Sequence, residues 1–137
     1  MGSVKVRYEG GDRLVVTVRG HDVAVDQPVS DGGGDTAPTP VELFVGSLAA
    51  CAGFYAERFL RRHGLPLDGL AVDADFGFAE ERPARVGRVS LRLRLPVGFP
   101  SSYRDRLAKV VEHCTVHNSI RVAPEIGIEL EGEASAA

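Results

Sequence analysis

Residues 40–63 read PVELFVGSLAACAGFYAERFLRRH, and this stretch decides the fold because it is the longest uninterrupted helix that the sequence predicts. Thr39 has the position of an N-cap, Pro40 stands at the first helical position, and Glu42 has the spacing of a capping box with Thr39. The sequence Gly-Leu-Pro directly after residue 63 ends the helix. These signals bound one long helix with Cys51 at its middle.

The apolar character of this helix predicts how it is covered. Residues 43–56 carry no charged side chain, and this run is too short to span a bilayer but has the length of a buried core helix. A helix that is apolar on every side needs protein on every side. Because a chain of 137 residues is small, we expect a second copy of the chain to supply part of this cover. Small side chains recur at helical spacing and would let another backbone approach, namely Gly46, Ala49, Ala50 and Gly53.

The remaining segments predict an α+β chain that forms a single domain over residues 1–137. Alternation and turn signals predict three strands at residues 4–8, 14–19 and 22–26, followed by a glycine-rich, mobile connector at 27–37. Two further strands, at 70–78 and 88–95, form a second hairpin. A second helix follows residue 100 with Leu107, Val110, Val111 and Cys114 on one stripe. A closing strand at 126–132 precedes a tail at 134–137 that frays, so the expected order is β-β-β-α-β-β-α-β.

The charge of the chain bears on its partners. The net charge is −3 and the sequence has no concentrated basic patch, which argues against nucleic acid or an anionic membrane surface as a partner. Small molecules or other protein chains fit better. The N-terminal residues lack the apolar core of a signal peptide, and we therefore expect a cytoplasmic protein.

The two cysteines allow two interpretations. Free cysteine is among the most buried residue types and often serves as a small apolar side chain. However, Cys51 and Cys114 occupy core-facing positions on the two predicted helices, and packing these helices together would bring the thiols within reach. Two such thiols can cycle between dithiol and disulfide through a sulfenic acid or a mixed disulfide. Phe44, Phe54 and Tyr55 share the helix face of Cys51 and are the expected apolar contacts for a substrate.

A metal site is a weaker possibility. His113, Cys114 and His117 have ligand-like spacing, and Cys51 could complete a four-ligand zinc site. The geometry is unfavourable, because His113 and Cys114 are neighbours that point ~100° apart on a helix, and no second ligand pair accompanies them. We therefore expect no metal and no other cofactor.

Two motifs resemble those of a known family. Residues 36–51 read TAPTPVELFVGSLAAC and resemble the helix-opening signature of the OsmC and Ohr proteins, in which a Pro-x-Glu-Leu segment precedes an Ala-rich turn and a reactive cysteine. Residues 114–120 read CTVHNSI and resemble the second cysteine motif of that family, Cys-Pro-Val-Ser-x-x-Leu. The resemblance covers nearly the whole chain and is closer to the less characterised OsmC-like branch than to the typical Ohr peroxidases.

The resemblance implies an intertwined homodimer with the long helices buried at its centre. It also implies thiol-dependent reduction of organic hydroperoxides, in which Cys51 attacks the peroxide, Cys114 resolves the product and an external dithiol completes the turnover. In the family an arginine and a glutamate hold the thiolate and the peroxide. No motif places the arginine here, so Arg7, Arg13 and Arg19 are candidates with Arg19 as the first choice, and Glu42 is the candidate glutamate. Val41 occupies the typical glutamate position, and Glu42 lies ~180° round the helix from Cys51, which favours a capping role.

Two other functions remain open at this point. The chain could be a non-catalytic module that binds a small apolar ligand or senses oxidation, or both thiols could be inert. Thr115 and His117 stand where the second motif has proline and serine, so the motif alone does not choose between these functions.

Overall fold

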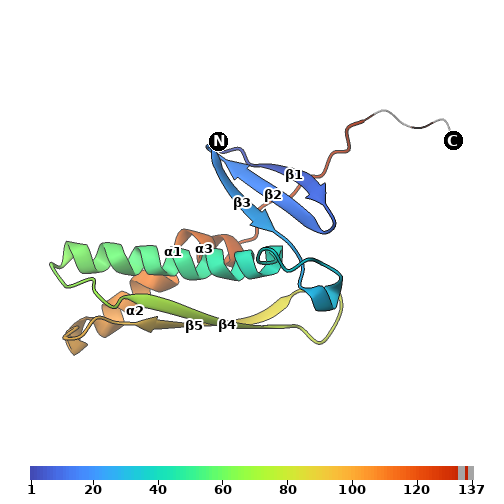
Figure 1. The fold of residues 1–137 in the computed structure, drawn as a ribbon. Helices are drawn as coiled ribbons and strands as arrows, with labels where there is room; N and C mark the ends of the chain where they lie inside the picture. Colours follow the sequence, from blue (N-terminus) through green and yellow to red (C-terminus); the bar gives the residue numbers. More distant parts are fainter. Residues whose placement is uncertain (133–134, 136–137) are drawn as a thin grey trace.

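The structure is a computed structural model that describes residues 1–132 and Ser135, and this part of the chain has an α+β fold (Figure 1). Its two antiparallel sheets contain β1 (Lys5–Gly10), β2 (Arg13–Val18) and β3 (His21–Val25) in the first, and β4 (Ala71–Phe78) and β5 (Val86–Arg94) in the second. Its helices are α1 (Pro40–Arg62), α2 (Arg104–Glu112) and α3 (Thr115–Arg121), with short 3-10 turns η1 (Val29–Asp31) and η2 (Ser101–Tyr103). The predicted fold class and the first six elements are confirmed. The expected fraying of residues 134, 136 and 137 lies outside the described residues.

The start of α1 is fixed by the predicted capping box. The backbone N–H of Thr39 donates to Glu42 Oε1 at 2.8 Å, and the backbone N–H of Glu42 donates to Thr39 Oγ1 at 3.1 Å. Pro40 occupies the first turn, where its missing N–H costs no helical hydrogen bond. At the other end, the ring of His63 lies with Nδ1 2.9 Å from the carbonyl oxygen of Phe59. The helix therefore begins and ends where the local sequence signals predict.

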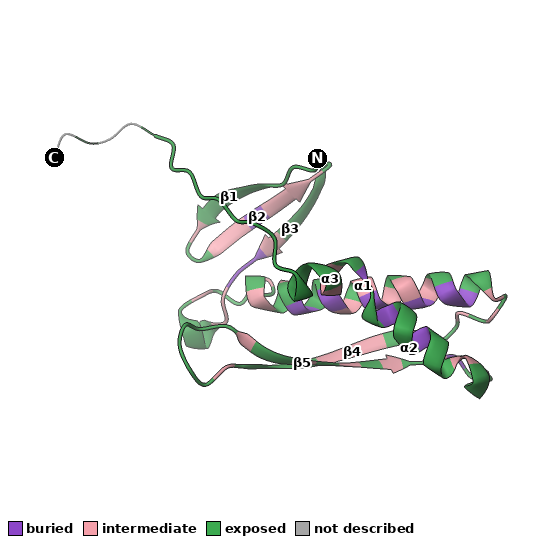
Figure 2. Cartoon of the chain, turned by 180° about the vertical axis from the view of Figure 1, so that it is seen from behind, coloured by how far each residue is buried: buried purple, intermediate pink, exposed green. Residues whose placement is uncertain are grey.

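The core lies where α1 packs against the β4–β5 sheet and α2 (Figure 1). Buried and exposed residues alternate along α1, so the helix has one covered and one uncovered side (Figure 2). Phe54 is 48% exposed on the uncovered side, and Phe44 in the first turns of α1 is 43% exposed. The prediction that α1 is covered all round is therefore not met within one chain. The core cluster consists of Ala52, Ala56, Phe59, Leu60, Leu107 and Val111.

The first sheet stands on the far side of α1 from the β4–β5 sheet (Figures 1 and 2). Its central strand is β2, in which Val16 pairs with Val6 of β1 and with Val23 of β3. Among the described residues, no helix makes extensive contact with this sheet. One face of the sheet is consequently exposed, including Val6 and Tyr8.

The connector between β3 and α1 is organised by a single carboxylate. Asp26 is 3% exposed, and its carboxylate accepts hydrogen bonds from the backbone N–H of Gln27 and from both the backbone N–H and the hydroxyl of Thr36. The backbone N–H of Asp26 donates to the carbonyl oxygen of Pro38 at 3.1 Å. The segment predicted as a mobile connector is thus tied at both of its ends.

The second half of the chain departs from the prediction at two places. The expected second helix is divided into α2 and α3, because Cys114 has an extended backbone (φ −64°, ψ 151°) and acts as the N-cap of α3.

The expected closing strand at 126–132 is not formed. A strand needs a neighbouring strand edge for its backbone hydrogen bonds, and here Ile126, Ile128 and Leu130 remain 81%, 85% and 95% exposed.

Among the described residues, α1 is the one helix with the length and composition of a membrane span. The core helix of a soluble protein meets the same criteria, so this is weak evidence for a membrane location.

The hydrogen bonds of Asp26 predict an acid-sensitive connector. The Thr36 hydroxyl and the neighbouring backbone N–H groups lower the pKa of Asp26 from 3.8 to about 2. A lowered pKa favours the folded state above the unfolded value, so this stabilisation is present above pH 3.8 and is lost as the pH falls through about 2. We expect Asp26→Asn to weaken the pH dependence of the unfolding free energy between these values, measured by urea unfolding at several pH values.

The matched control is Asp12→Asn, which changes an exposed carboxylate in the β1–β2 turn. Equal pH dependence in the Asp26→Asn and Asp12→Asn proteins would contradict the assigned role of Asp26.

Candidate functional site

The two cysteines come together where α1 and α3 pack against each other. Both are free thiols, with Cys51 half-buried in the middle of α1 and Cys114 fully buried at the start of α3. Burial raises the pKa of the Cys114 thiol, and the interaction with the neighbouring Cys51 side chain raises it further. The core-facing placement predicted for both residues therefore brings the two thiols close to each other.

The sulfur of Cys114 takes part in the folding of its own helix. Cys114 Sγ accepts a hydrogen bond from the backbone N–H of His117 at 3.4 Å, which is the usual contact of an N-cap side chain. The backbone N–H groups of His117 and Val116 lower the pKa of this thiol, against the larger effect of burial. Burial thus favours the protonated form of the Cys114 thiol.

A second contact between the helices lies next to the thiols. The hydroxyl of Tyr55 and the hydroxyl of Thr115 are 2.8 Å apart and share a hydrogen bond. Tyr55 follows Cys51 by one helical turn, and Thr115 follows Cys114 directly. This hydrogen bond therefore crosses the same interface as the two sulfurs.

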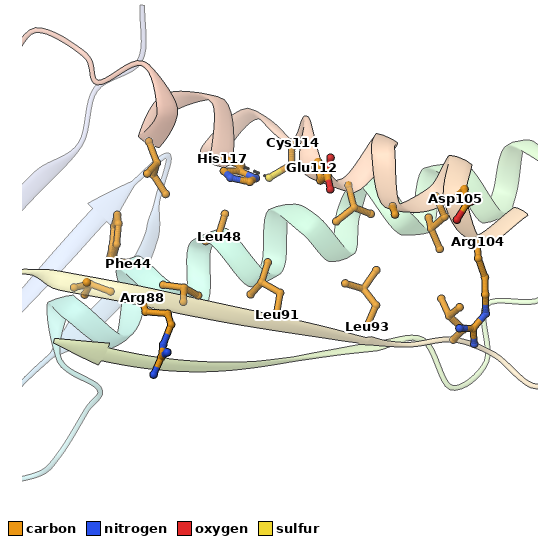
Figure 3. Close-up of a pocket in the computed structure, with 18 residues that line it drawn as sticks. Phe44, Leu48, Arg88, Leu91, Leu93, Arg104, Asp105, Glu112, Cys114 and His117 are labelled. Carbon is orange, nitrogen blue, oxygen red and sulfur yellow. Dashed lines mark hydrogen bonds between the residues drawn. The ribbon is translucent and has the colours of Figure 1, made fainter. Parts of the chain in front are cut away.

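A cavity of about 780 Å³ opens between α1, β5 and the α2–α3 segment (Figure 3). Its wall is mainly apolar, with Phe44 and Leu48 from α1 and leucines from β5 and α2, and it includes the buried Cys114 and the ring of His117. Arg104, Asp105 and Glu112 of α2 also line it, whereas Arg88 directs its guanidinium away from the helices (Figure 3). This volume is in the range of small-molecule pockets.

The predicted substrate contacts are separated by the structure. Phe44 lines the cavity, whereas Phe54 and Tyr55 are not among its lining residues. The Phe54 ring packs under the guanidinium of Arg58 at 4.8 Å, and its edge meets the Tyr55 ring at 6.1 Å. Cys51 borders the thiol contact and is likewise not a lining residue of the cavity.

The two predicted charged partners lie away from the thiols. Glu42 is engaged in the capping box of α1. Arg19 occupies the tight turn between β2 and β3 with a positive φ of 49°, at the end of the sheet farther from α1 (Figure 1). Within this chain, neither side chain is in contact with Cys51.

Sequence reasoning did not identify the cavity or the Tyr55–Thr115 contact. The alternation along β5 did predict inward-facing leucines, which was the available signal for the cavity wall. In the described ranges 1–132 and 135, no group of three or more His, Cys, Asp or Glu residues could hold a metal ion.

Comparison with known proteins gives a consistent result for the fold. A family model described as OsmC-like protein matches residues 32–129. A solved structure from Psychrobacter arcticus 273-4, assigned to the osmotic stress and detoxification response, is similar with a TM-score of 0.80 and 22% identity, covering 87% of this chain and 88% of that one. No curated protein matches this chain at a significant level.

Two structures of organic hydroperoxide resistance proteins are also similar. The protein from Legionella pneumophila has a TM-score of 0.63 and 22% identity over 87% of this chain and 89% of its own. OhrB of Bacillus subtilis has a TM-score of 0.64 and 20% identity over 88% of this chain and 92% of its own. At these identities the likeness establishes the fold.

The environment of Cys114 predicts how its thiol titrates. In a Cys51→Ala protein Cys114 is the remaining thiol, and burial should still hold its pKa above the ordinary value of about 8.5. The ultraviolet absorbance of the thiolate, followed against pH, should therefore have its midpoint above that value. A midpoint at or below the ordinary value would show that the helix N–H groups outweigh burial.

The same shift has a consequence for stability. Because the folded state holds the thiol proton more tightly, its contribution is fully present below the unfolded pKa and is lost as the pH rises through the folded pKa. The double variant Cys51→Ala/Cys114→Ala, in which this thiol is absent, is the control for the alkaline fall in unfolding free energy.

Proposed function

This chain belongs to the OsmC-like family, and from this membership we propose that it is a thiol-dependent peroxidase that reduces organic hydroperoxides. The observation that carries the proposal is the pair of free thiols held together at the α1–α3 interface, one half-buried and one fully buried. The likeness to organic hydroperoxide resistance proteins supports the choice of substrate class.

The proposed reaction has two chemical steps. The Cys51 thiolate attacks the terminal oxygen of the hydroperoxide, the O–O bond breaks, and the products are a Cys51 sulfenic acid and the alcohol after protonation of the alkoxide. The Cys114 sulfur then attacks Cys51 Sγ and displaces hydroxide, which leaves as water with the Cys114 proton. An external dithiol reduces the disulfide and restores both thiols.

The roles of the two cysteines follow from their exposure. Cys51 is half-buried, so a hydroperoxide can approach its sulfur, whereas Cys114 is fully buried and carries a raised pKa. Cys114 is therefore suited to react with a neighbouring sulfur rather than with a molecule from solution. This division assigns attack to Cys51 and resolution to Cys114.

Attack on a peroxide also needs a cation near the thiolate. A thiol with the ordinary pKa of ~8.5 is only a few per cent ionised at neutral pH, and a nearby positive charge increases that fraction. Arg7 pairs with Glu9 and Thr17, and Arg13 pairs with Glu9 and Thr36. Of the three arginines in the first sheet and its turns, Arg19 is the one for which the described residues provide no such partner, so we assign it this role.

Because the β2–β3 turn that holds Arg19 is at the end of the first sheet farther from α1, the proposal takes this arginine from a second copy of the chain and therefore includes a homodimer. The exposed side of α1 and the exposed face of the first sheet are the surfaces that a second copy would cover. The proposal requires that in this dimer the β2–β3 turn of one chain lies beside the thiols of the other.

One observation favours a second candidate function. The apolar cavity includes Cys114 but not Cys51 among its lining residues, as expected for a module that binds a small apolar ligand or senses oxidation. In either case the net charge of −3 argues against nucleic acid as a partner, and a cytoplasmic location with its reducing thiols fits the free cysteines.

Trapping the oxidation products distinguishes the peroxidase from a module that only binds a ligand. One equivalent of cumene hydroperoxide should give an intramolecular Cys51–Cys114 disulfide in the wild type, a sulfenic acid on Cys51 in Cys114→Ser, and no product at either site in Cys51→Ser. Mass spectrometry of peptides after alkylation gives these states directly. A folded wild-type protein in which Cys51 stays reduced would rule out the peroxidase and leave the binding module.

Mixing a weakly active variant with an inactive one tests which chain of the dimer supplies the arginine. Arg19→Ala should lower turnover at pH 7 by ~10-fold or more, since an opposite charge shifts a pKa by one to three units. If Arg19 acts across the dimer, refolding Arg19→Ala together with Cys51→Ser should restore about a quarter of the wild-type turnover, because about half the dimers are mixed and each has one complete site.

Arg7→Ala is the matched control for this experiment, because Arg7 is paired within its own sheet. If the mixture stays inactive, Arg19 does not act from the second chain. Sedimentation of the wild type at micromolar concentration checks the dimer independently, and a compact monomer would remove this part of the proposal.

A further inference from the structure

We propose that the hydrogen bond between Tyr55 and Thr115 holds α3 against α1 so that the two sulfurs face each other, which makes Tyr55 and Thr115 positioning residues for disulfide formation. This inference rests on the proposed dithiol cycle and names two residues to which that cycle assigns no chemical step. Its starting observation is the 2.8 Å distance between the two hydroxyl oxygens.

The Tyr55–Thr115 hydrogen bond lies next to the contact between the two sulfurs. Tyr55 is four residues after Cys51, so it is on the same side of α1 and about 6 Å further along the axis. Thr115 is the first residue of α3 and follows Cys114 directly. Each helix therefore contributes one sulfur and one hydroxyl to the interface, and fixing the hydroxyls fixes the register of the sulfurs.

Few other contacts hold α3 in place. The helix has seven residues, a length at which an isolated helix is not stable in water. In the part of the chain that the structure describes, the Tyr55–Thr115 bond is the one side-chain hydrogen bond between α1 and residues 115–121 of α3, and the other such contact is between the thiols of Cys51 and the N-cap Cys114. Residues 122–132 after α3 are all exposed. Loss of this bond would leave the buried Cys114 as the main attachment of the helix start.

The position of the sulfur matters most at the resolving step. The Cys51 sulfenic acid and the Cys114 thiol combine to form one S–S bond and one water molecule, and the S–S bond requires the two sulfurs at ~2.05 Å with a restricted torsion. A second hydroperoxide competes for the sulfenic acid and oxidises it to a sulfinic acid. A helix start that stays in register favours the disulfide over this loss.

The backbone conformation at Thr115 allows a substitution that removes the hydroxyl and keeps the start of α3. Thr115 is at the first position of α3, where proline is favoured, and the extended backbone of Cys114 before it is the conformation that precedes proline. Thr115→Pro should therefore keep the helix start while removing the hydroxyl. Tyr55→Phe removes the other hydroxyl and keeps the ring, and Thr115→Ser keeps the hydrogen bond as the matched control.

The test measures the stability of the Cys51–Cys114 disulfide in glutathione redox buffers without peroxide. Tyr55→Phe and Thr115→Pro should each lower the effective concentration of the thiols ~5-fold, since a typical hydrogen bond is worth about this factor, and raise the reduction potential by ~20 mV. Thr115→Ser should match the wild type. The double variant Tyr55→Phe/Thr115→Pro should be no worse than either single variant, because both remove the same bond.

A second readout uses excess cumene hydroperoxide. Tyr55→Phe and Thr115→Pro should accumulate more sulfinic acid on Cys51 than the wild type or Thr115→Ser. The comparison is made between proteins with equal free energies of unfolding in urea. Wild-type potentials in both single variants, or additive effects in the double variant, would overturn the positioning role.

The results for the positioning role and for the proposed peroxidase can be distinguished. If the redox buffers show the predicted shifts but cumene hydroperoxide oxidises neither cysteine, the positioning role stands and the proposed peroxidase falls. If the wild type forms no disulfide in the redox buffers, the positioning role is overturned, whatever the peroxide does.

Discussion

The rest of this structure depends on a helix that is apolar all round and is covered by its own chain on one side. The β4–β5 sheet and α2 bury Ala52, Ala56 and Leu60 completely, but they leave Phe44 and Phe54 at 43% and 48% exposure. Burial of apolar surface is the main favourable term in folding, so the open side is a cost that association with another chain can remove. The same requirement places the middle of α1, and therefore Cys51, near any such interface.

The sequence predicts those parts of the fold that are determined by neighbours along the chain. The capping box of Thr39 and Glu42 and the alternation along β5 depend on residues within one turn or one strand, and the structure contains both. The break before α3 was not predicted, because Cys114 continues an apolar stripe that is typical of a single helix. Its sulfur instead accepts the N–H of His117, a role that the sequence pattern does not reveal.

Residues 126–132 show a second limit of prediction from sequence, which concerns contacts between distant parts of the chain. Their alternation is typical of a strand, yet a strand forms only by pairing with another strand edge, and in the described part of this chain Ile126 and Ile128 pair with neither sheet. Arg19 has the same limitation. Its residue type fits the stabilisation of a thiolate, but a sequence does not say whether a turn reaches a site in its own chain or in a second copy.

The two thiols illustrate how one interface gives the same residue type two roles. Helical periodicity indicated that packing the helices could bring Cys51 and Cys114 within reach, although Cys114 is the extended N-cap of α3 and not part of a continuous helix. Their difference comes from tertiary structure: Cys114 is fully buried with a raised pKa, and Cys51 is half-buried. The raised pKa of Cys114 disfavours attack by its thiol on a molecule in solution. The same pKa is a smaller obstacle to attack on the neighbouring Cys51 sulfenic acid, because the hydroxide that leaves Cys51 can take the thiol proton of Cys114 and form water. The proton that burial retains on Cys114 is thus the proton that the proposed resolving step consumes.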